Sequence, residues 1–240
     1  MSAMRRGART APPALPPDAA AEGLTAPVED YLKAVYELEF SGEAAATSDL
    51  AARLELSPAS VSGMVRRLAE QGLLDHVPYK GVRLTATGRR AALRTIRRHR
   101  VLESYLATVL GVPWDRVHDE AEALEHAASD DLIDRMAAAL GDPAFDPHGA
   151  PIPTRDGSVD ETRHATLLEL PVGAPATVMS VSDDDPAMLR YLAELALRPG
   201  TPVTVRGRAP FDGPIEVLVG DAPHQIGPTL ARAVRVARTP

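Results

Sequence analysis

The stretch that decides the fold runs from residue 47 to residue 85: TSDLAARLELSPASVSGMVRRLAEQGLLDHVPYKGVRLT. Its apolar residues recur first at helical spacing and then in two short runs around the turn 78–81. Ser57 and Pro58 are typical of a helix start, because serine caps the helix and proline fits its first turn. The order predicts a short helix, a second helix ending at Gln71-Gly72, and a β-hairpin. This arrangement is a winged helix-turn-helix.

Helical spacing also appears on both sides of this stretch. The pattern predicts a helix over residues 28–40 and, after the hairpin, a long helix capped by Thr87 that runs through Leu110. A further helix is expected from Asp115 to Leu140, with a break near Ser129. The fold class is therefore mainly α with a small β component.

The last third of the chain changes character. Residues 141–162 are rich in Pro, Gly and Asp and indicate a loop and linker. After them, short apolar runs predict strands, and a helix over residues 186–196 interrupts these strands. The predicted strands cover residues 165–168, 176–179, 203–205, 215–219 and 234–236. Short strands at this spacing predict a small β-barrel as a third domain.

Composition limits the function classes. The 240 residues are 45% hydrophobic and 25% charged, as in a globular protein of two or three domains. The chain contains no cysteine, which excludes disulfides, thiolate metal ligands and cysteine nucleophiles. No apolar run approaches the ~18 residues of a membrane helix, and the N-terminus lacks the apolar core of a signal peptide. We therefore expect a cytoplasmic protein with no membrane partner.

Charge is distributed unevenly along the chain. The net charge of −7 alone argues against a nucleic-acid partner. However, residues 44–100 hold 11 Lys and Arg against 4 Asp and Glu, a net charge of +7. Residues 101–161 hold 3 Lys and Arg against 14 Asp and Glu, a net charge of −11. The first block is suited to a polyanion and the second to cations.

A set of metal-type ligands repeats in the acidic block. Four of them share one predicted helix face at i,i+3 and i,i+4 spacings: His118, Glu122, Glu125 and His126. On the preceding helix, His99 and Glu103 are also four residues apart. A solvated helix face is the alternative reading of such pairs. A di-iron enzyme would need a Glu-x-x-His pair on each of two helices, and this chain has no such second pair. The repetition beside apolar positions favours a metal site.

Several segments together resemble the DtxR/MntR family of metal-dependent transcriptional repressors. The resemblance is strong over residues 28–153 and weaker over the rest. The segments that carry it are Glu29-Asp30-Tyr31-Leu32, residues 57–62, His99-Arg100-Val101-Leu102-Glu103, residues 118–126, and the proline loop His148-Gly149-Ala150-Pro151-Ile152-Pro153. The C-terminal barrel is similar to the SH3-like domain of the longer members. The resemblance implies a repressor rather than an enzyme.

The resemblance implies two metal sites. The primary site would use Asp30, Glu122, Glu125 and His126, and the second site would use His99, Glu103, His118 and Asp185. For Asp185, a role as helix N-cap is an equal alternative. The iron branch of the family has methionine and cysteine at the positions of Asp30 and Glu122. Carboxylates at both positions favour Mn²⁺, with Fe²⁺ as the alternative. Short manganese sensors carry a further acid at the position of Lys33, so a binuclear site of that kind is not expected.

The family also implies a partner and an assembly. The protein would be a homodimer, and the third helix of each chain would read bases of a pseudo-palindromic operator. The regulated genes would be metal-uptake genes. The expected DNA contacts are Ser57, Ser60, Ser62, Gly63, Arg66, Arg67, Lys80 and Arg83, with phosphate contacts also expected from Arg89, Arg90, Arg94, Arg97 and Arg98. The residues expected to pack the dimer interface, although some of them must serve the core of the single chain, are Val101, Leu102, Tyr105, Leu106, Val109, Leu110 and Trp114. Family members commonly carry a polar residue at position 63.

Domain boundaries and alternatives complete the prediction. The expected parts are a disordered tail 1–26, a winged-helix domain 27–95, a helical metal-binding and dimerisation domain 96–153, a linker 154–164, and an SH3-like, FeoA-like domain 165–240. A metal-binding helical enzyme is the less favoured alternative. A metal-free winged-helix protein, with the acidic helix as an interaction surface, is another.

Overall fold

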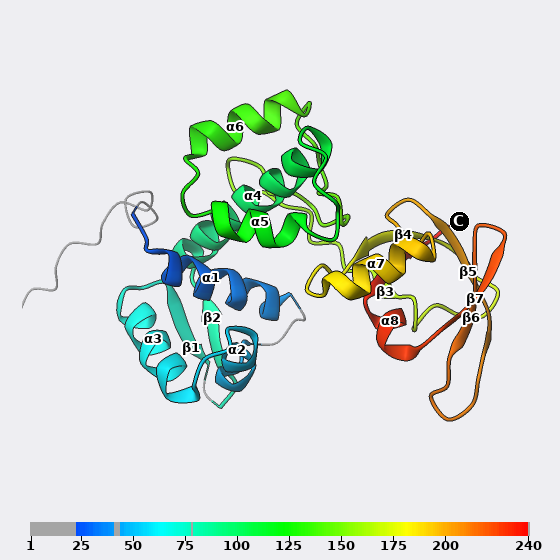
Figure 1. Ribbon diagram of the computed structural model, residues 1–240. Helices are drawn as coiled ribbons and strands as arrows, with labels where there is room; N and C mark the ends of the chain where they lie inside the picture. Colours follow the sequence, from blue (N-terminus) through cyan, green and yellow to red (C-terminus); the bar gives the residue numbers. More distant parts are fainter. Residues whose placement is uncertain (1–22, 41–43, 78, 240) are drawn as a thin grey trace, which may run out of the picture. The chain divides into compact units, whose positions relative to one another are not determined.

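The computed structural model describes residues 23–40, 44–77 and 79–239. It divides after Ala91 into two compact units. Figure 1 shows their helices and strands. Most of the predicted tail, residues 1–26, lies outside the described residues.

The first unit is the predicted winged helix-turn-helix. Its elements are α1 (Ala26–Glu39), α2 (Thr47–Arg53), α3 (Pro58–Glu70), β1 (Leu74–Val77), β2 (Gly81–Leu84) and the start of α4 (Ala86–Thr108). Side chains from all three complete helices form its core, including the fully buried Leu32, Leu50 and Leu68. The Ser57 hydroxyl accepts a hydrogen bond from the Ser60 amide and caps α3 as expected.

The wing is attached to the body of this unit by backbone contacts. β1 and β2 pair antiparallel, and Ala45 forms an isolated bridge with Val82 of β2. Gly81 is required beside this bridge, because its φ is +118° and a Cβ there would lie 2.0 Å from the Ala45 carbonyl oxygen. The hairpin is therefore held in a fixed place.

The cap of the long helix α4 differs from the prediction. α4 begins at Ala86, and the Thr85 hydroxyl accepts a hydrogen bond from the Gly88 amide. Thr87 is thus a helical residue and Thr85 is the cap. Thr85 and Thr87 are two residues apart and both are suitable caps, so the sequence alone did not distinguish them.

The second unit begins with α4 and two shorter helices. The predicted break at Ser129 separates α5 (Val117–Leu124) from α6 (Asp130–Ala139), and the Ser129 hydroxyl caps α6. As expected for some residues of the predicted dimer set, Val101, Leu102 and Leu106 are buried in the core of this unit, with Val117 and Ile133. Val109 and Leu110 are exposed by 51% and 62%.

A six-stranded antiparallel sheet forms the rest of the second unit. Its elements are β3 (Ala165–Thr166), β4 (Pro175–Val181), α7 (Pro186–Glu194), β5 (Pro202–Arg208), β6 (Ile215–Val219), β7 (Ala222–Ile226), α8 (Pro228–Arg232) and β8 (Val234–Arg238). The strand order is β3-β8-β4-β5-β6-β7. The predicted SH3-like domain is confirmed, although β7 and α8 were not among the predicted elements.

The sheet domain contacts the helices of its own unit. Trp114, which precedes α5, packs against the core of the sheet domain. The Val181 amide at the end of β4 donates to the His148 carbonyl at 2.9 Å. Gly149 permits this approach, since a Cβ at its φ of +87° would lie 2.0 Å from the Met179 carbonyl oxygen. These contacts bring the segment after β4 next to α4 and α5. In the described part of the chain, no helix is long and apolar enough to cross a membrane.

Candidate metal centre

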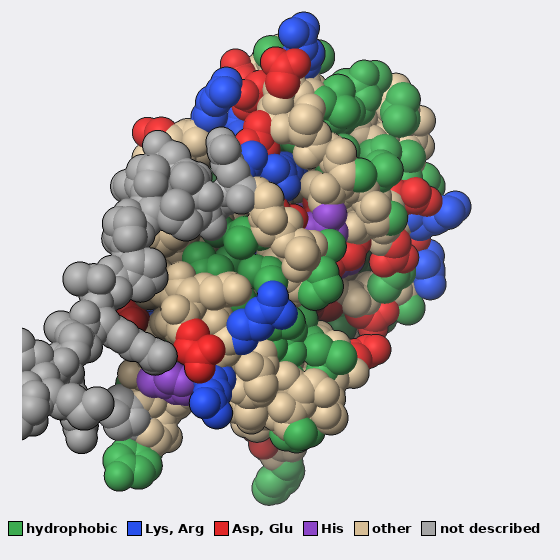
Figure 2. Space-filling view, turned by 90° about the vertical axis from the view of Figure 1, so that its left-hand side faces the viewer, with side chains coloured by type: hydrophobic (Ala, Val, Ile, Leu, Met, Phe, Trp, Pro, Cys, Tyr) green, Lys and Arg blue, Asp and Glu red, His purple; other side chains and the backbone are tan. Residues whose placement is uncertain are grey.

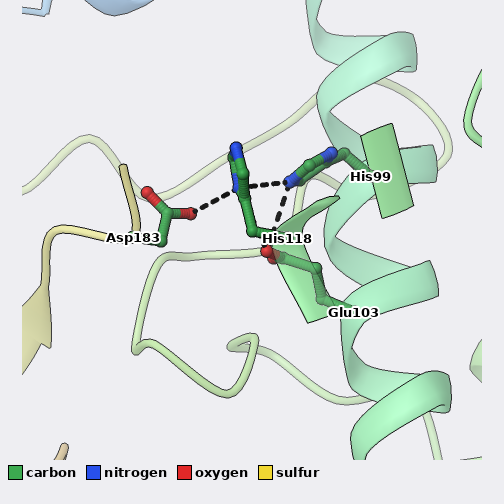
Figure 3. Close-up of side chains that lie close together, drawn as sticks. All are labelled: His99, Glu103, His118 and Asp183. Carbon is green, nitrogen blue, oxygen red and sulfur yellow. Dashed lines mark hydrogen bonds and ion pairs between the residues drawn. The ribbon is translucent and has the colours of Figure 1, made fainter. Parts of the chain in front are cut away.

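Four side chains from three segments converge beside α4. They are His99 and Glu103 on α4, His118 on α5 and Asp183 after β4 (Figure 3). Each offers one ligand atom, and these four atoms all lie within 4.8 Å of one another. His99 Nε2 is 3.2 Å from Glu103 Oε1 and 3.2 Å from His118 Nδ1. His118 Nδ1 is 3.4 Å from Asp183 Oδ2. We call these four residues the second cluster.

The second cluster is buried at its two α4 residues, half-buried at His118 and Asp183, and strongly polarised. The Glu103 side chain is fully buried, and His99 is 4% exposed. Contacts with Asp183 and then Glu103 raise the pKa of His118 to about 10, against the opposing effect of burial. Burial would raise the pKa of Asp183, but its contact with His118 lowers the pKa well below its usual range. An ionised network of this kind surrounds a small volume with ligand atoms.

Two residues that were not predicted as ligands border the second cluster. His148 Nδ1 lies 3.6 Å from Glu103 Oε1 and 4.0 Å from Asp183 Oδ2. Asp146, with Glu103 and His148, forms another group of closely spaced ligand atoms. Burial and the nearby Glu103 charge raise the pKa of Asp146 to about 7. With these two residues, five donor side chains lie around Glu103: two imidazoles and one carboxylate of the second cluster, and the bordering His148 and Asp146.

Hydrogen bonding shows that a cation fits here. His148 Nε2 is 2.7 Å from the Trp114 carbonyl oxygen, which can only accept, so the ring hydrogen lies on Nε2. In the neutral ring, Nδ1 then carries a lone pair, and it faces carboxylate oxygens. Neither this nitrogen nor the Glu103 oxygens have a hydrogen-bond partner among the described residues. A divalent cation would satisfy these buried acceptors together.

The residues predicted for the primary site are placed in both units. Asp30 lies on α1 in the first unit, and Glu122, Glu125 and His126 lie in the second. α5 ends at Leu124, so Glu125 is its C-cap and His126 follows the helix. Glu125 is fully buried, and its Oε1 is 3.5 Å from His126 Nε2. Of the four residues predicted to share one helix face, only His118 and Glu122 therefore lie within α5. We call Glu122, Glu125 and His126 the first cluster.

Asp185, predicted for the second site, lies outside the second cluster. Its Oδ1 accepts hydrogen bonds from the backbone amides of Ala187 and Met188, and it is exposed. It is therefore the N-cap of α7. The carboxylate that faces His118 belongs to Asp183, two residues earlier. Three consecutive aspartates precede Pro186, and only the docking of this segment on α5 distinguishes them.

The predicted DNA contacts are exposed in the first unit. On α3 these are Ser57, Ser60, Ser62, Gly63, Arg66 and Arg67, and on the wing Lys80 and Arg83. The Ser57 and Ser62 hydroxyls also bond to the start of α3 itself. Arg66 contacts Glu70 at 3.3 Å, but both side chains remain mostly exposed. A Cβ at position 63 would meet nothing within 4 Å, so this surface is open.

Three arginines that were expected to contact DNA phosphates form ion pairs within the second unit. Arg94 and Arg98 of α4 both pair with Asp130, at 2.6 and 2.8 Å, and Arg97 pairs with Asp134 at 3.0 Å. These pairs join α4 to the start of α6. Part of the positive charge of residues 44–100 therefore forms ion pairs inside the second unit. On the surface seen in Figure 2, Lys and Arg side chains lie next to Asp and Glu side chains.

Comparisons with known proteins agree with this organisation. Residues 23–82 match the family described as the N-terminal DNA-binding domain of iron-dependent repressors, residues 85–154 match its metal-binding and dimerisation domain, and residues 165–238 match the FeoA domain. The iron-dependent repressor IdeR of Mycobacterium leprae is 32% identical over 222 residues, which cover 88% of this chain and 96% of IdeR.

Solved structures give the same result. A manganese-dependent transcriptional repressor in complex with manganese is 43% identical, with a TM-score of 0.82 over 88% of this chain and all of that chain. The manganese regulator SloR is 28% identical, with a TM-score of 0.75 over 88% of this chain and 98% of that chain. The similar proteins are thus repressors that respond to manganese or to iron.

Proposed function

The chain belongs to the DtxR/MntR family of metal-dependent transcriptional repressors, and from this premise we propose that Mn²⁺ is its corepressor. It is a DNA-binding repressor that responds to a divalent metal. The observation that supports metal control in this chain is the convergence of ligand atoms around His99, together with the buried acceptors of Glu103 and His148 beside it, which have no hydrogen-bond partner among the described residues.

The choice of Mn²⁺ rests on the ligands proposed for the primary site. Asp30 with the first cluster would give three carboxylates and one imidazole. Oxygen-rich sets suit Mn²⁺, whereas thiolate and thioether ligands suit softer ions. Fe²⁺ is the second candidate, because the second cluster contains two imidazoles, a third imidazole borders it, and imidazole suits iron.

Control of DNA binding would act through α1. Without a cation, the carboxylates of the first cluster would repel one another and would oppose the approach of Asp30. With the cation bound, Asp30 would hold α1 to the first cluster and reduce the freedom of the winged helix. A homodimer could then present its two α3 helices one DNA turn apart on a pseudo-palindromic operator. The metal would thus shift a population of arrangements toward the one that binds DNA.

DNA contact would be divided between α3 and the wing. The exposed serines of α3 would approach base edges, and the charged side chains Arg66, Arg67, Lys80 and Arg83 would contact phosphates. Because Gly63 offers no side chain, we expect DNA shape to contribute to specificity. We expect the exposed Val109 and Leu110 to be part of the dimer interface.

A metal titration of DNA binding tests the proposal. The probe is a duplex selected by the full-length protein from a random 30-bp pool in the presence of Mn²⁺, followed by fluorescence anisotropy. We expect binding to appear with Mn²⁺, to disappear with excess chelator, and to require more Fe²⁺ than Mn²⁺ under anaerobic conditions. Binding that is indifferent to all divalent metals would exclude the corepressor role.

Two substitutions separate the metal response from DNA contact. Glu122→Ala should abolish the Mn²⁺ response, because it removes a ligand proposed for the primary site. Arg66→Ala should weaken DNA binding while Mn²⁺ affinity stays unchanged. If Glu122→Ala kept the full Mn²⁺ response, the proposed primary site would be wrong.

A further inference from the structure

One imidazole lies between the two clusters of the second unit. His99, on α4, is 4% exposed, and its two ring nitrogens face different carboxylates. Nδ1 is 2.5 Å from Glu125 Oε2 of the first cluster. Nε2 is 3.2 Å from Glu103 Oε1 of the second cluster. The ring therefore spans the gap between two groups of candidate ligands.

The hydrogen bonds define which nitrogen can bind a cation. A carboxylate oxygen accepts hydrogen bonds, so the short contact with Glu125 places the hydrogen of the neutral ring on Nδ1. The lone pair then lies on Nε2, which points into the second cluster (Figure 3). His148 has the same arrangement, with Nε2 held by the Trp114 carbonyl and Nδ1 facing Glu103. Histidine ligands of metals are commonly oriented in this way by an outer acceptor.

Glu125, which accepts the hydrogen bond from His99, also makes a contact within the first cluster. Glu125 is fully buried at the end of α5, and its other oxygen, Oε1, is 3.5 Å from His126 Nε2. One carboxylate thus contacts a first-cluster imidazole through one oxygen and orients a second-cluster imidazole through the other. A direct connection of this kind couples the two positions without movement of any helix.

We propose that Glu125 is a positioning residue for the second cluster, and that it couples metal occupancy of the two clusters through the His99 ring. This inference rests on the proposed metal-binding function. Glu125 holds Nδ1–H and so presents the Nε2 lone pair to the second cluster. A cation that orders Glu125 in the first cluster also orders His99, so each cluster binds metal more tightly when the other is filled.

Three single variants test the coupling in the full-length protein. Glu125→Ala removes the acceptor of Nδ1–H, whereas Glu125→Gln keeps an oxygen acceptor and loses the charge. His126→Ala is the matched control, because it removes a first-cluster ligand and leaves the contact between Glu125 and His99. Mn²⁺ binding to the second cluster is followed by quenching of Trp114, the single tryptophan, whose ring is 5.5 Å from the His148 ring.

The expected pattern is specific to a positioning role. Glu125→Ala should weaken second-cluster Mn²⁺ affinity by about 10–100-fold, the usual effect of losing an outer partner of a histidine ligand. Glu125→Gln should recover most of that loss, and its second-cluster affinity should equal that of His126→Ala. Equal losses in Glu125→Ala and His126→Ala, or no loss in either, would overturn the proposal. If wild-type protein bound no Mn²⁺, the proposed function itself would fail.

A spectroscopic measurement on the wild-type protein is independent of whether the variants fold. Long-range ¹⁵N–¹H spectra of the imidazoles, recorded without metal and with Cd²⁺ as a diamagnetic probe, identify the nitrogen that binds the ion. We expect His99 to keep Nδ1–H and to change its Nε2 shift. A Cd²⁺ effect at Nδ1 would assign His99 to the first cluster, with Glu122 and Glu125, and would overturn the proposal.

Discussion

Asp183 and Asp185 are two residues apart and have different roles. Asp183→Ala removes the carboxylate that contacts His118, so we expect one bound Mn²⁺ per chain to be lost. Asp185→Ala is the matched control. It removes the cap of α7 and should cost about 1 kcal/mol of folding stability without changing the number of bound ions. Equilibrium dialysis with elemental analysis measures the bound metal, and loss of an ion in Asp185→Ala alone would contradict this assignment.

The protonation of His118 predicts a pH dependence for metal binding. Its pKa of about 10 means that the ring is an imidazolium at pH 7 and must lose a proton before its nitrogen can bind a cation. We therefore expect second-cluster affinity to rise with pH, by up to about tenfold per unit for one released proton. Calorimetric titrations in two buffers of different ionisation enthalpy should show this release.

The same ionised contacts stabilise the metal-free protein in a defined pH range. Because folding raises the pKa of His118 from 6.5, its stabilisation is complete below pH 6.5 and is lost as the pH rises through about 10. For the proton release on metal binding, Asp183→Asn provides the control, since removal of the charge should lower the His118 pKa and reduce the release.

A heat of metal binding that did not depend on the buffer would contradict the predicted proton release.

At the scale of elements, the pairs between α4 and α6 predict a structural role for arginines of the positive block. Asp130→Asn weakens the acceptor of both Arg94 and Arg98. Since the Asp130 side chain is 38% exposed, we expect a loss of about 1 kcal/mol in urea unfolding, less than for a buried charged hydrogen bond. DNA affinity at saturating metal should stay unchanged.

The matched variant lies on the wing. Lys80→Ala should leave the unfolding free energy unchanged, because Lys80 is exposed. It should weaken DNA binding and reduce the salt slope of log K by about one. If Asp130→Asn weakened DNA binding as much as Lys80→Ala, the arginines of α4 would be part of the DNA surface after all.

Elements with a clear sequence period were predictable, and those without one were not. The helices α1 to α6 follow from apolar spacing, and the caps Ser57 and Ser129 also mark the starts of α3 and α6. β7 contains Pro223, His224 and Gln225, which interrupt the alternation expected of a strand, and it forms because β6 provides a partner strand. The end of α5 at Leu124 also has no glycine or proline to indicate it.

At the scale of the whole molecule, the proposed metal ligands come from segments far apart in the sequence. His99, Glu103 and His118 were predictable from i,i+4 spacing and resemblance to a family. Asp146, His148 and Asp183 were not predicted, because Asp146 and His148 approach Glu103 through the fold of the loop after α6, and Asp183 through the docking of the sheet domain. The contact between the Val181 amide and the His148 carbonyl is part of this docking. Local sequence patterns contain no information about such contacts.

Concentration of negative charge predicts that metal also stabilises the fold. Residues 101–161 have a net charge of −11, and several carboxylates lie close together in the clusters. A ligand that binds only the native state stabilises it by about 1.4 kcal/mol per site for each tenfold rise in concentration above its Kd. We therefore expect the midpoint of thermal unfolding to rise steadily with Mn²⁺ and to fall with chelator. Ca²⁺ is the control, because it prefers six to eight oxygen ligands and should stabilise much less than Mn²⁺. Equal effects of the two ions would indicate general charge screening and would exclude built sites.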